Sequence, residues 1–581
     1  MLIKRILINN FRNLDEITID FNRISNYIIG ENNLGKSNLF DLLYLVFNGK
    51  RFEETDFGDT NKRIEAIITL ILNDDEKGFF EDNFSAEDSS FVTISYTQNI
   101  DESFPEVKCI DTEEKMSSKI LKKIHYFRYS STASPTKELK FDSPNGAGKV
   151  FNGIIDLFLK NPENRVDFLN DEAIQALTIF INENLQKLKG FTNYGIQATV
   201  AEKPYELLSN LFFLSDGARR IETTGSGIQY IAMVTLNIIS QIMEVYRSKS
   251  IDFNDHIYCT ETGKRFFPII IALDEPEVHL HPYLQRSLIS YYKKIINNQD
   301  SEFLELLKRC FDIDGLSGQL LIVTHSSDIL MDDYRNIIRF YKDNNTTRAI
   351  SGVTLDSILP ESARKQLLMH FHELRETFYA HAVIIVEGET EYGAFPIFAS
   401  KIGISIDDLC ISIIMAQGER SINPIKQLLK AFKIKTVTVY DGDVKSNNST
   451  GDSTEFYTDE KCFEIEIFNK LYSNGQIDTI KTIAKEIKSD VETVMDWDFV
   501  KKGMKYLGKS IDEQNYTPKK LSDIDENDVD DFCTMYKIWY MKAKGVISGR
   551  IYGEYISKDY IPDCYINALN MAKEISSNEN C

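Results

Sequence analysis

The chain has 581 residues, 43% of them hydrophobic and 27% charged, which is too long for one core and predicts roughly three or four domains. Its formal net charge of −22 argues against a general nucleic-acid coat, but does not exclude a metal-dependent nuclease. No apolar run approaches the roughly 18 residues of a membrane span, and no signal-peptide pattern opens the chain, so a cytoplasmic protein is expected. The eight cysteines include no C-x-x-C pair, which argues against a disulfide framework and a zinc site.

A phosphate-binding motif lies near the start of the chain. Alternating side chains over residues 1–29 predict a β-hairpin, and Asn26–Ile29 is a short β-prone run. Gly30–Ser37 then fits G-x-x-x-x-G-K-[ST] at every required position, and Ser37–Phe47 carries apolar residues at helical spacing. A strand, a glycine turn and a helix therefore follow one another in the order that a P-loop requires.

The P-loop residues predict a bound nucleotide, ATP or GTP. The two glycines let successive backbone N–H groups point at phosphate oxygens, assisted by the helix N-terminus. Lys36 is expected to reach the β- and γ-phosphates, and the Ser37 hydroxyl is expected to bind Mg²⁺. The predicted nucleotide-binding residues here are Gly30, Asn33, Gly35, Lys36, Ser37 and Asn38.

The next part of the chain changes from strands to helices. Residues 64–72, 91–97 and 120–127 are β-like, whereas 147–212 has apolar residues at helical spacing. We therefore interpret 1–146 as the first segment of a nucleotide-binding domain and 147–212 as a helical insertion. Such an insertion suits dimerisation, although the pattern fits an ordinary packed helical pair equally well.

A second set of nucleotide motifs begins near residue 213. Glu222–Gln229 is a glycine-rich turn that leads into an apolar helix, and Phe266–Leu273 is an unbroken apolar run that ends in two acids. A buried parallel strand delivers such acids to the carboxyl edge of the sheet, where ligands bind. Asp274 is expected to hold Mg²⁺ through water and Glu275 to polarise the attacking water. His325, after a further apolar strand, is placed to reach the γ-phosphate.

Taken in order, these motifs resemble the ABC-type ATPase heads of the RecF, SMC and OLD (overcoming lysogenization defect) group. Phe11–Asn13, Asp274–Pro282 and Thr324–Ser327 carry the resemblance. In such heads the glycine-rich signature acts in trans, so the resemblance implies a dimer in which Ser226 and Gly227 of one subunit close over ATP held by the other. The signature lacks the Leu-Ser-Gly-Gly form of transporters, and a serine replaces a proline that many relatives carry after the histidine.

The second half of the chain carries a separate group of acids. Ala382–Val386 is a short apolar strand followed by Glu387 and, one helical turn later, Glu391. A second β-rich run ends at Asp441 and Asp443, whose i, i+2 spacing predicts that both point to the same side of the strand end. Such carboxylates suit one or two Mg²⁺ or Mn²⁺ ions, as phosphodiester hydrolysis requires. The alternative is a pair of acidic turns in an ordinary α/β domain.

These acids resemble the Toprim fold, and an ABC head followed by Toprim resembles the OLD-family endonucleases. The predicted fold class is α/β: an ABC-type ATPase domain (1–146 and 213–365) with the helical insertion, then a Rossmann-like Toprim domain (366–581) with C-terminal helical additions. The resemblance points to Glu464, with Glu466 in reserve, as a further metal ligand and to Lys544, ahead of Lys542, as a catalytic lysine that stabilises charge on the phosphate. Residues 478–530 match no part of this pattern.

The expected protein is a homodimeric or larger ATP-regulated endonuclease that nicks or cuts DNA with Mg²⁺ or Mn²⁺. The resemblance extends to Gabija nucleases and retron-associated OLD effectors, which implies bacterial defence against phage and a companion protein, either a helicase-like subunit or a reverse transcriptase with its DNA–RNA product. The alternatives are a Toprim topoisomerase or primase, and a nucleotide-gated DNA-binding or clamp component. The predicted catalytic residues are Glu275, His325, Glu387, Asp441, Asp443 and Lys544, and the predicted metal ligands are Ser37, Asp274, Glu387, Glu391, Asp441, Asp443 and Glu464.

Overall fold

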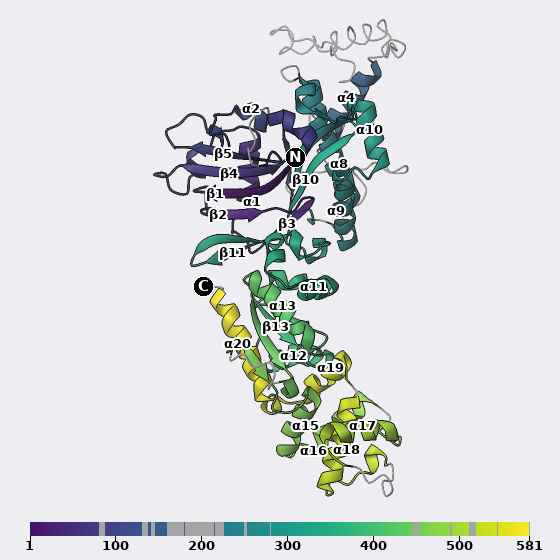
Figure 1. Cartoon of the computed structure of the whole chain (residues 1–581). Helices are drawn as coiled ribbons and strands as arrows, with labels where there is room; N and C mark the ends of the chain where they lie inside the picture. The colour runs from purple at the N-terminus through teal and green to yellow at the C-terminus, as the bar shows by residue number, and fades with distance from the viewer. Residues whose placement is uncertain are drawn as a thin grey trace, which may run out of the picture. The chain divides into compact units, whose positions relative to one another are not determined.

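The computed structural model divides the chain into two compact units (Figure 1). Unit 1 comprises Met1–Asp332 with Asn336–Ser351, and unit 2 comprises Asp333–Arg335 with Gly352–Cys581. The residues that the structure describes are 1–80, 88–130, 138–140, 146–159, 179, 214, 226–248, 252–278, 280–444, 452–488, 491–510, 519–542 and 544–579.

Unit 1 begins with an antiparallel sheet of order β2-β1-β4-β5-β6. Its strands are β1 (Leu2–Asn9), β2 (Ile17–Asp20), β4 (Ile64–Ile71), β5 (Phe91–Gln98) and β6 (Glu106–Cys109). Buried and partly exposed residues alternate along β4 and β5, as expected for a sheet with one face in the core. The predicted hairpin at the start of the chain is confirmed, because β1 pairs antiparallel with β2.

The second sheet of unit 1 carries the nucleotide motifs and has the order β12-β11-β3-β10-β9-β7. Five of its strands run parallel, from β11 to β7, and β12 is antiparallel to β11. The strands are β3 (Ser25–Ile29), β7 (His125–Ser130), β9 (Arg265–Asp274), β10 (Gly315–Val323), β11 (Ile337–Asp343) and β12 (Thr346–Ser351), and the short β8 (Tyr258–Cys259) pairs with β9. The parallel arrangement brings the carboxyl ends of β3, β10, β9 and β7 to one edge.

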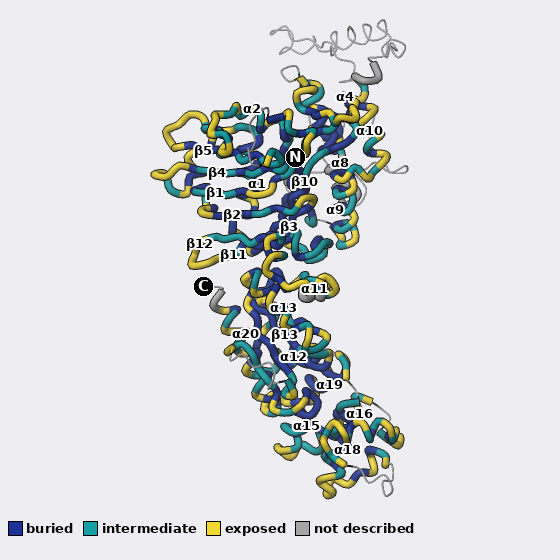
Figure 2. The backbone as a smooth tube through the Cα atoms, in the orientation of Figure 1, coloured by how far each residue is buried: buried dark blue, intermediate teal, exposed yellow. Residues whose placement is uncertain are grey.

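Helix α1 connects the two sheets of unit 1. One hydrophobic cluster joins residues of both sheets to the buried side chains of α1 (Lys36–Phe47). Buried residues are dark blue along the backbone tube in Figure 2. The other described helices of unit 1 are α2 (Ser118–Leu121), α4 (Gly146–Leu159), α8 (Ser226–Arg247), α9 (Pro282–Ile296) and α10 (Ser301–Phe311). This packing holds the first turn of α1, where the P-loop lysine lies, against a rigid core.

The predicted strand at 120–127 and the predicted helical insertion differ in outcome. The strand predicted over 120–127 is wrong in its first half, because Ser118–Leu121 is helical and β7 starts only at His125. The cause is local: the Ser117 side chain accepts a hydrogen bond from the Lys119 backbone N–H (3.3 Å) and caps a short helix. Most of the predicted helical insertion, residues 160–212, lies outside the described residues.

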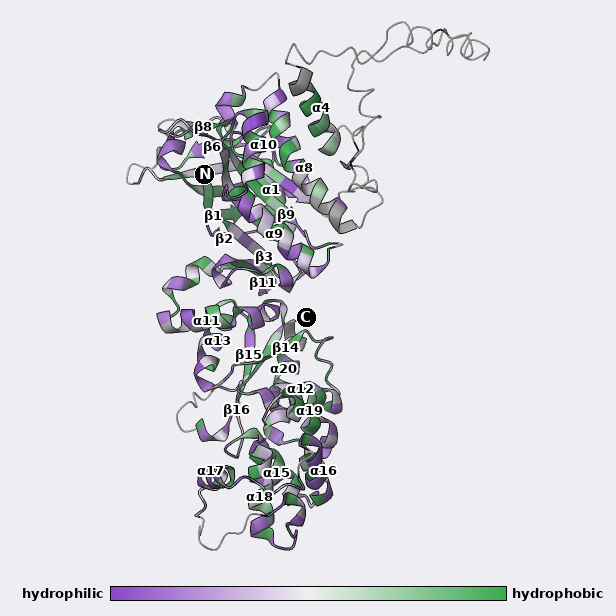
Figure 3. Ribbon diagram, turned by 90° about the vertical axis from the view of Figure 1, so that its right-hand side faces the viewer, coloured by the Kyte–Doolittle hydropathy of each residue, from purple (hydrophilic) through white to green (hydrophobic). Residues whose placement is uncertain are grey.

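Unit 2 is built on a parallel sheet of order β14-β13-β15-β16. The strands are β13 (Ala382–Val386), β14 (Ile411–Met415), β15 (Lys435–Tyr440) and β16 (Glu455–Tyr457). The helices are α11 (Glu361–Leu374), α12 (Glu389–Ile402), α13 (Glu419–Ala431), α15 (Phe463–Ser473), α16 (Ile477–Ile487), α17 (Trp497–Leu507), α18 (Val529–Lys542), α19 (Val546–Tyr555) and α20 (Asp563–Glu579). Figure 3 shows β14, β15 and β16 of this sheet among the helices of unit 2. No described helix is both long enough and apolar enough to span a membrane.

Close contact between α12 and α19 positions the first turns of α19 against the start of α12. A Cβ atom at Gly549 would lie 2.0 Å from the Thr390 carbonyl oxygen, and one at Gly393 would lie 2.2 Å from the Val546 carbonyl oxygen. Only glycine allows the two backbones to approach this closely. The α/β fold class that the sequence predicted, an ATPase head followed by a Toprim-like sheet, is confirmed.

Candidate nucleotide and metal sites

The P-loop of unit 1 is folded around its own lysine. Gly30 and Gly35 have φ values of 139° and 89°, and Asn33 has a φ of 64°, so the loop turns through the left-handed region that glycine and asparagine tolerate. The Lys36 Nζ donates hydrogen bonds to the carbonyl oxygens of Gly30 (2.8 Å) and Glu31 (2.6 Å). Burial lowers the pKa of Lys36 to about 8. A phosphate group would restore a counter-charge to this ammonium.

The two predicted magnesium ligands of this pocket lie side by side. Asp274 is the last residue of the buried strand β9, and Ser37 is the second residue of α1. The Ser37 Oγ donates to the Asp274 Oδ1 across 3.4 Å. A hydroxyl and a carboxylate are ligands that Mg²⁺ accepts together with nucleotide phosphates, so these residues fit a magnesium-bound nucleotide.

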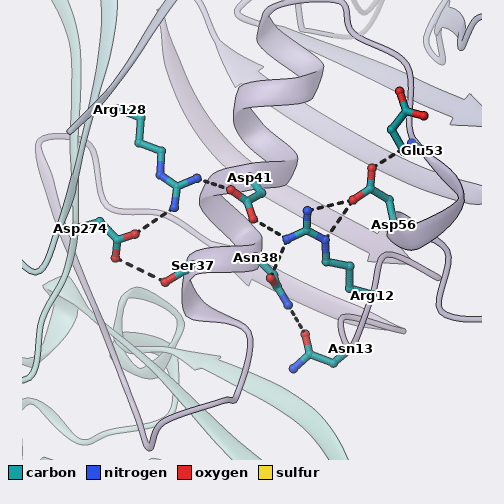
Figure 4. A network of polar contacts seen from close by, with 9 residues as sticks. All are labelled: Arg12, Asn13, Ser37, Asn38, Asp41, Glu53, Asp56, Arg128 and Asp274. Atoms are coloured by element: carbon teal, nitrogen blue, oxygen red, sulfur yellow. Dashed lines mark hydrogen bonds and ion pairs between the residues drawn. The ribbon is translucent and has the colours of Figure 1, made fainter. Parts of the chain in front are cut away.

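A network of alternating acids and arginines extends from Asp274 (Figure 4). The Arg128 Nη2 donates to the Asp274 Oδ2 (2.9 Å), and Nη1 of the same guanidinium is paired with Asp41 on α1. Arg12 is paired with Asp41 as well and binds Asp56 across 2.9 Å. Every carboxylate of this network therefore has an arginine partner.

Sequence reasoning missed Arg128 and Asp41, and treated Arg12 only as part of a family resemblance. The available signals were a charged residue directly after the predicted strand 120–127 and another within the predicted helix Ser37–Phe47. Asn38, a predicted nucleotide ligand, is held by this network, since it accepts from Arg12 (2.8 Å) and donates to Asn13 (2.7 Å).

Glu275 and His325, the predicted hydrolytic pair, lie beside each other after β9 and β10. The Glu275 backbone has a φ of 51°, and its N–H donates to the Val323 carbonyl oxygen (2.9 Å). The His325 Nε2 is 3.6 Å from the Glu275 Oε1, and burial lowers the pKa of His325. Glu277, which the sequence did not single out, accepts from the His325 backbone N–H (2.6 Å) and so positions this loop.

The predicted signature is only partly described. Residues 222–225 lie outside the described residues, and Ser226 and Gly227 form the first turn of α8 without a description of the Ser226 side chain.

Unit 2 contains a pocket of about 510 Å³ at the carboxyl ends of its strands. Glu387 follows β13 and Asp441 follows β15, while Glu391 and Glu464 lie in the first turns of α12 and α15. The lining residues are Glu387, Gly388, Glu389, Thr390, Glu391, Met415, Gln417, Gly418, Asp441, Glu464 and Lys544. Five of these side chains are acidic and one is basic. We call this group the carboxylate pocket.

The carboxylate pocket has too little positive charge for its acids. Burial, followed by Glu391 and Glu387, raises the pKa of Asp441 to about 9. Burial and Glu464 raise the pKa of Glu391 to about 7. Burial alone would lower the pKa of Lys544, but its acidic neighbours, led by Glu464, raise it above the ordinary lysine value. These carboxylates therefore retain protons unless a cation replaces them.

Contacts within the pocket show which oxygens remain available. The Thr390 hydroxyl donates to the Glu464 Oε1 (2.9 Å), and the Gly545 N–H donates to the Thr390 hydroxyl (3.3 Å). The buried Glu464 Oε2 accepts no hydrogen bond among the described residues and lies 3.5 Å from the Lys544 Nζ. A hard divalent cation fits this set of oxygens. No three acid, histidine or cysteine side chains in the described ranges are already grouped as metal ligands, so a cation would have to draw the carboxylates together.

The geometric prediction for Asp443 is wrong. The strand ends at Tyr440, and Gly442–Val444 form a single 3-10 turn, so Asp441 and Asp443 do not share a strand face. The turn is fixed because the Gly442 N–H donates to the Thr458 Oγ1 (2.8 Å). Asp441 lines the carboxylate pocket and Asp443 does not.

The second-choice residues for the metal ligand and the catalytic lysine, Glu466 and Lys542, have other partners. Glu466 accepts a hydrogen bond from the Glu460 backbone N–H (2.8 Å), and Lys542 lies 5.2 Å from the ring centroid of Trp539. Gly418, the N-cap residue of α13, lines the pocket with a φ of 116°.

Two family models match the chain. "Overcoming lysogenization defect protein-like, TOPRIM domain" matches residues 378–443, and "AAA ATPase domain" matches residues 1–143 and 163–330, which is more than half of the chain. The DNA replication and repair protein RecF of Histophilus somni is 42% identical over 53 residues, 9% of this chain and 15% of RecF. RecF of Haemophilus influenzae is 36% identical over 79 residues, 14% of this chain and 19% of RecF. The matches thus span less than a fifth of these curated relatives.

Two solved structures illustrate the structural comparison. An Smc head bound to the C-winged helix domain of ScpA is 15% identical, with a TM-score of 0.33, and covers 60% of this chain and 97% of its own. The C-terminal region of the Burkholderia pseudomallei OLD protein is 16% identical, with a TM-score of 0.22, and covers 34% of this chain and 99% of its own. From the two family models, the chain belongs to the AAA ATPase domain family and is an ATPase–Toprim protein of the OLD (overcoming lysogenization defect) family.

Proposed function

We propose that this protein binds and hydrolyses ATP and, under nucleotide control, nicks or cuts DNA as a metal-dependent endonuclease. One observation carries the proposal: five charged side chains from four separate segments line one pocket at the carboxyl edge of the unit 2 sheet, namely Glu387, Glu391, Asp441, Glu464 and Lys544. Such an edge is where α/β folds bind ligands, and a nucleotide pocket lies in the same chain.

The acids and the lysine of the carboxylate pocket would have different roles. Glu387, Glu391, Asp441 and Glu464 would hold Mg²⁺ or Mn²⁺, which when bound supplies Lewis-acid activation of water and of the scissile phosphate. Lys544 would stabilise the negative charge that develops on the phosphate, since its raised pKa keeps it protonated at neutral pH. Asp443 stays in the proposal as a residue that acts from outside the pocket lining.

The nucleotide pocket would act as the control element. Lys36, Ser37 and Asp274 would hold the nucleotide with its Mg²⁺, and Glu275 and His325 would orient the attacking water. Ser226 and Gly227 of a second copy would complete the pocket, so we propose a homodimer or larger homo-oligomer. Closure of this dimer on ATP is the event that would transmit nucleotide state to the rest of the chain.

Supercoiled plasmid tests the nuclease proposal directly. Incubation with Mg²⁺ or Mn²⁺, with and without ATP, is expected to yield nicked or linear DNA, and Glu387→Ala or Asp441→Ala is expected to stop the reaction. Asp408→Ala, at an exposed acid of unit 2 outside the pocket lining, is the matched control and should cleave normally. Cleavage that persists in both pocket variants would contradict the assignment, and closed relaxed circles would indicate a topoisomerase instead.

The cellular role that we propose is defence against phage, together with a companion protein of the helicase or reverse-transcriptase class. Cells that express the chain with its neighbouring genes are expected to reduce phage plating, and Asp441→Ala should abolish the reduction. Equal plating on cells with the wild-type and variant proteins would remove this part of the proposal and leave the nuclease chemistry unaffected.

A further inference from the structure

Helix α17 exposes two lysines and an aromatic ring along one face. Lys502, Lys505 and Tyr506 are spaced i, i+3 and i+4, and all three are exposed. Val500 and Gly503, on the other side, are buried. Neither Lys502 nor Lys505 makes an ion pair with any residue that the structure describes. This face of α17 therefore carries positive charge in a chain whose net charge is −22.

The ring of Tyr506 lies beside the helix that carries a predicted metal ligand. The Tyr506 hydroxyl donates to the Lys461 carbonyl oxygen (3.3 Å), and the Lys461 Nζ donates to the Tyr506 carbonyl oxygen (2.8 Å). Lys461 directly precedes Cys462, the N-cap residue of α15, and Glu464 follows in the first turn. These two hydrogen bonds therefore fix the end of α17 against the start of the helix that presents Glu464.

Tyr506 is also close enough to sense the acids of the site. Burial raises the pKa of the Tyr506 hydroxyl, and Cys462, Asp443 and Asp441 raise it further. The hydroxyl is thus neutral across the physiological range, and the ring remains an uncharged surface at the edge of a strongly acidic region. The Lys461 Nζ lies over this ring, 5.4 Å from its centroid, so a base would stack on the opposite face.

Helix α17 is held rigidly enough to act as a platform. The Asp496 carboxylate caps its start by accepting from the Asp498 (2.7 Å) and Phe499 (3.1 Å) N–H groups. A Cβ at Gly503 would lie 2.7 Å from the Ile538 side chain, so α17 packs closely on α18. The exposed face of α17 is therefore presented by a fixed backbone.

We propose that Tyr506, Lys502 and Lys505 form the surface that binds the DNA strand as it enters the carboxylate pocket. Tyr506 stacks on a base of that strand, and the two lysines contact backbone phosphates. Proteins that bind single strands combine these same two elements, cations for the backbone and aromatic rings for the bases. The proposal rests on the nuclease function proposed above and assigns a role to part of the segment 478–530, which the sequence left without one.

Strand binding is measured on the full chain in EDTA, where cleavage does not occur, by fluorescence anisotropy with a labelled single-stranded oligonucleotide. Charge reversal in Lys502→Glu/Lys505→Glu is expected to lower affinity by about tenfold or more and to reduce the salt slope by roughly 1.4, because two phosphate contacts are lost. The matched control, Lys485→Glu/Lys488→Glu, reverses two exposed lysines at the same spacing on and after α16, outside the pocket lining, and should bind normally.

The role of the ring is separated from its hydrogen bond by two substitutions. Tyr506→Phe keeps the stacking face and loses the bond to Lys461, so it should bind the strand like wild type. Tyr506→Ala should lower affinity by about tenfold without changing the salt slope, because it removes stacking and no charge. An equal loss in both variants would make Tyr506 a structural residue and overturn its assignment.

The outcomes for this surface and for the nuclease are independent. Unchanged oligonucleotide affinity in Lys502→Glu/Lys505→Glu, or an equal loss in Lys485→Glu/Lys488→Glu, would overturn the strand surface even if the wild type cuts plasmid. Polyglutamate that competes as well as an oligonucleotide of equal charge would overturn it too. A wild type that binds the strand through these residues but never cuts DNA would instead contradict the proposed nuclease.

Discussion

The two pockets of this chain share a location in the fold and differ in electrostatics. Both lie where parallel strands end, as ligand sites of α/β sheets do. In the nucleotide pocket, Asp274 and Asp41 each have an arginine partner, so the carboxylates are neutralised before any ligand arrives. In the carboxylate pocket, five acids face Lys544 alone.

This difference shows what each pocket needs from its ligand. The nucleotide pocket has acids that are already paired with arginines, and its own unmatched charge is the ammonium of Lys36, which a phosphate would balance. The carboxylate pocket has unmatched negative charge, which protons balance at present and a divalent cation would balance in the active protein.

The largest effect is expected from Asp441→Asn, which tests whether the two pockets work separately. Removal of this carboxylate oxygen, which we propose binds the metal, should lower plasmid cleavage on the order of 10³-fold or more and leave ATP hydrolysis within about twofold of wild type. Equal loss of both activities would show that the pockets cannot be separated in this way.

Asp441→Asn is expected to stabilise the folded protein although it lowers DNA cleavage. A carboxylate whose pKa is raised in the folded protein costs stability as pH rises from the unfolded pKa, about 4, toward the folded value of about 9. Without metal at pH 8, Asp441→Asn should therefore raise the free energy of unfolding by roughly 1–3 kcal/mol. The gain should disappear near pH 4, and chemical denaturation at the two pH values measures it.

A smaller effect, confined to the nucleotide pocket, is expected from Arg128→Met. The substitution leaves Asp274 without a guanidinium partner and Asp41 with Arg12 alone, so ATP hydrolysis should fall roughly 10–100-fold, as for other residues that orient metal ligands. Arg5→Met removes a mostly exposed arginine paired with Asp20 and is the control, for which no change is expected. Normal hydrolysis by Arg128→Met would mean that the arginine network does not position the magnesium site.

The smallest effect is the pH dependence of ATP binding. The charged form of Lys36, which phosphate prefers, becomes depleted as pH rises through its lowered pKa of about 8. ATP affinity should therefore fall about tenfold between pH 7 and pH 9. Lys36→Arg keeps its charge over this range and should give a flatter profile in equilibrium binding. Identical profiles would contradict the role of Lys36 burial.

The sequence predicted those parts of the sites that depend on short stretches of chain. The P-loop, the acid pair after β9, and Glu387 and Asp441 each follow a strand whose apolar residues are visible in the sequence, and the structure places each at a strand end. The position of Asp443 could not be predicted, because hydrogen bonds from Gly442 to residues about 16 positions later bend the chain away from the strand.

Contacts between distant segments could not be predicted from the sequence either. Arg128 and Asp41 are 87 residues apart, and nothing local indicates that they meet beside Asp274. Tyr506 reaches Lys461 across 45 residues from a helix that the sequence left unassigned. Contacts of this kind depend on how whole elements pack, which hydrophobic periodicity does not specify.

Calorimetric titration with Mn²⁺ tests the central claim most directly. At pH 7 without nucleotide, in two buffers of different ionisation enthalpy, the full chain is expected to bind Mn²⁺ and to release about one proton or more, because the cation replaces protons on Asp441 and Glu391. Asp274→Asn, which disables the nucleotide pocket's metal site, should retain both signals, and Asp441→Asn should lose them. Mn²⁺ binding without proton release, or full binding by Asp441→Asn, would contradict the account.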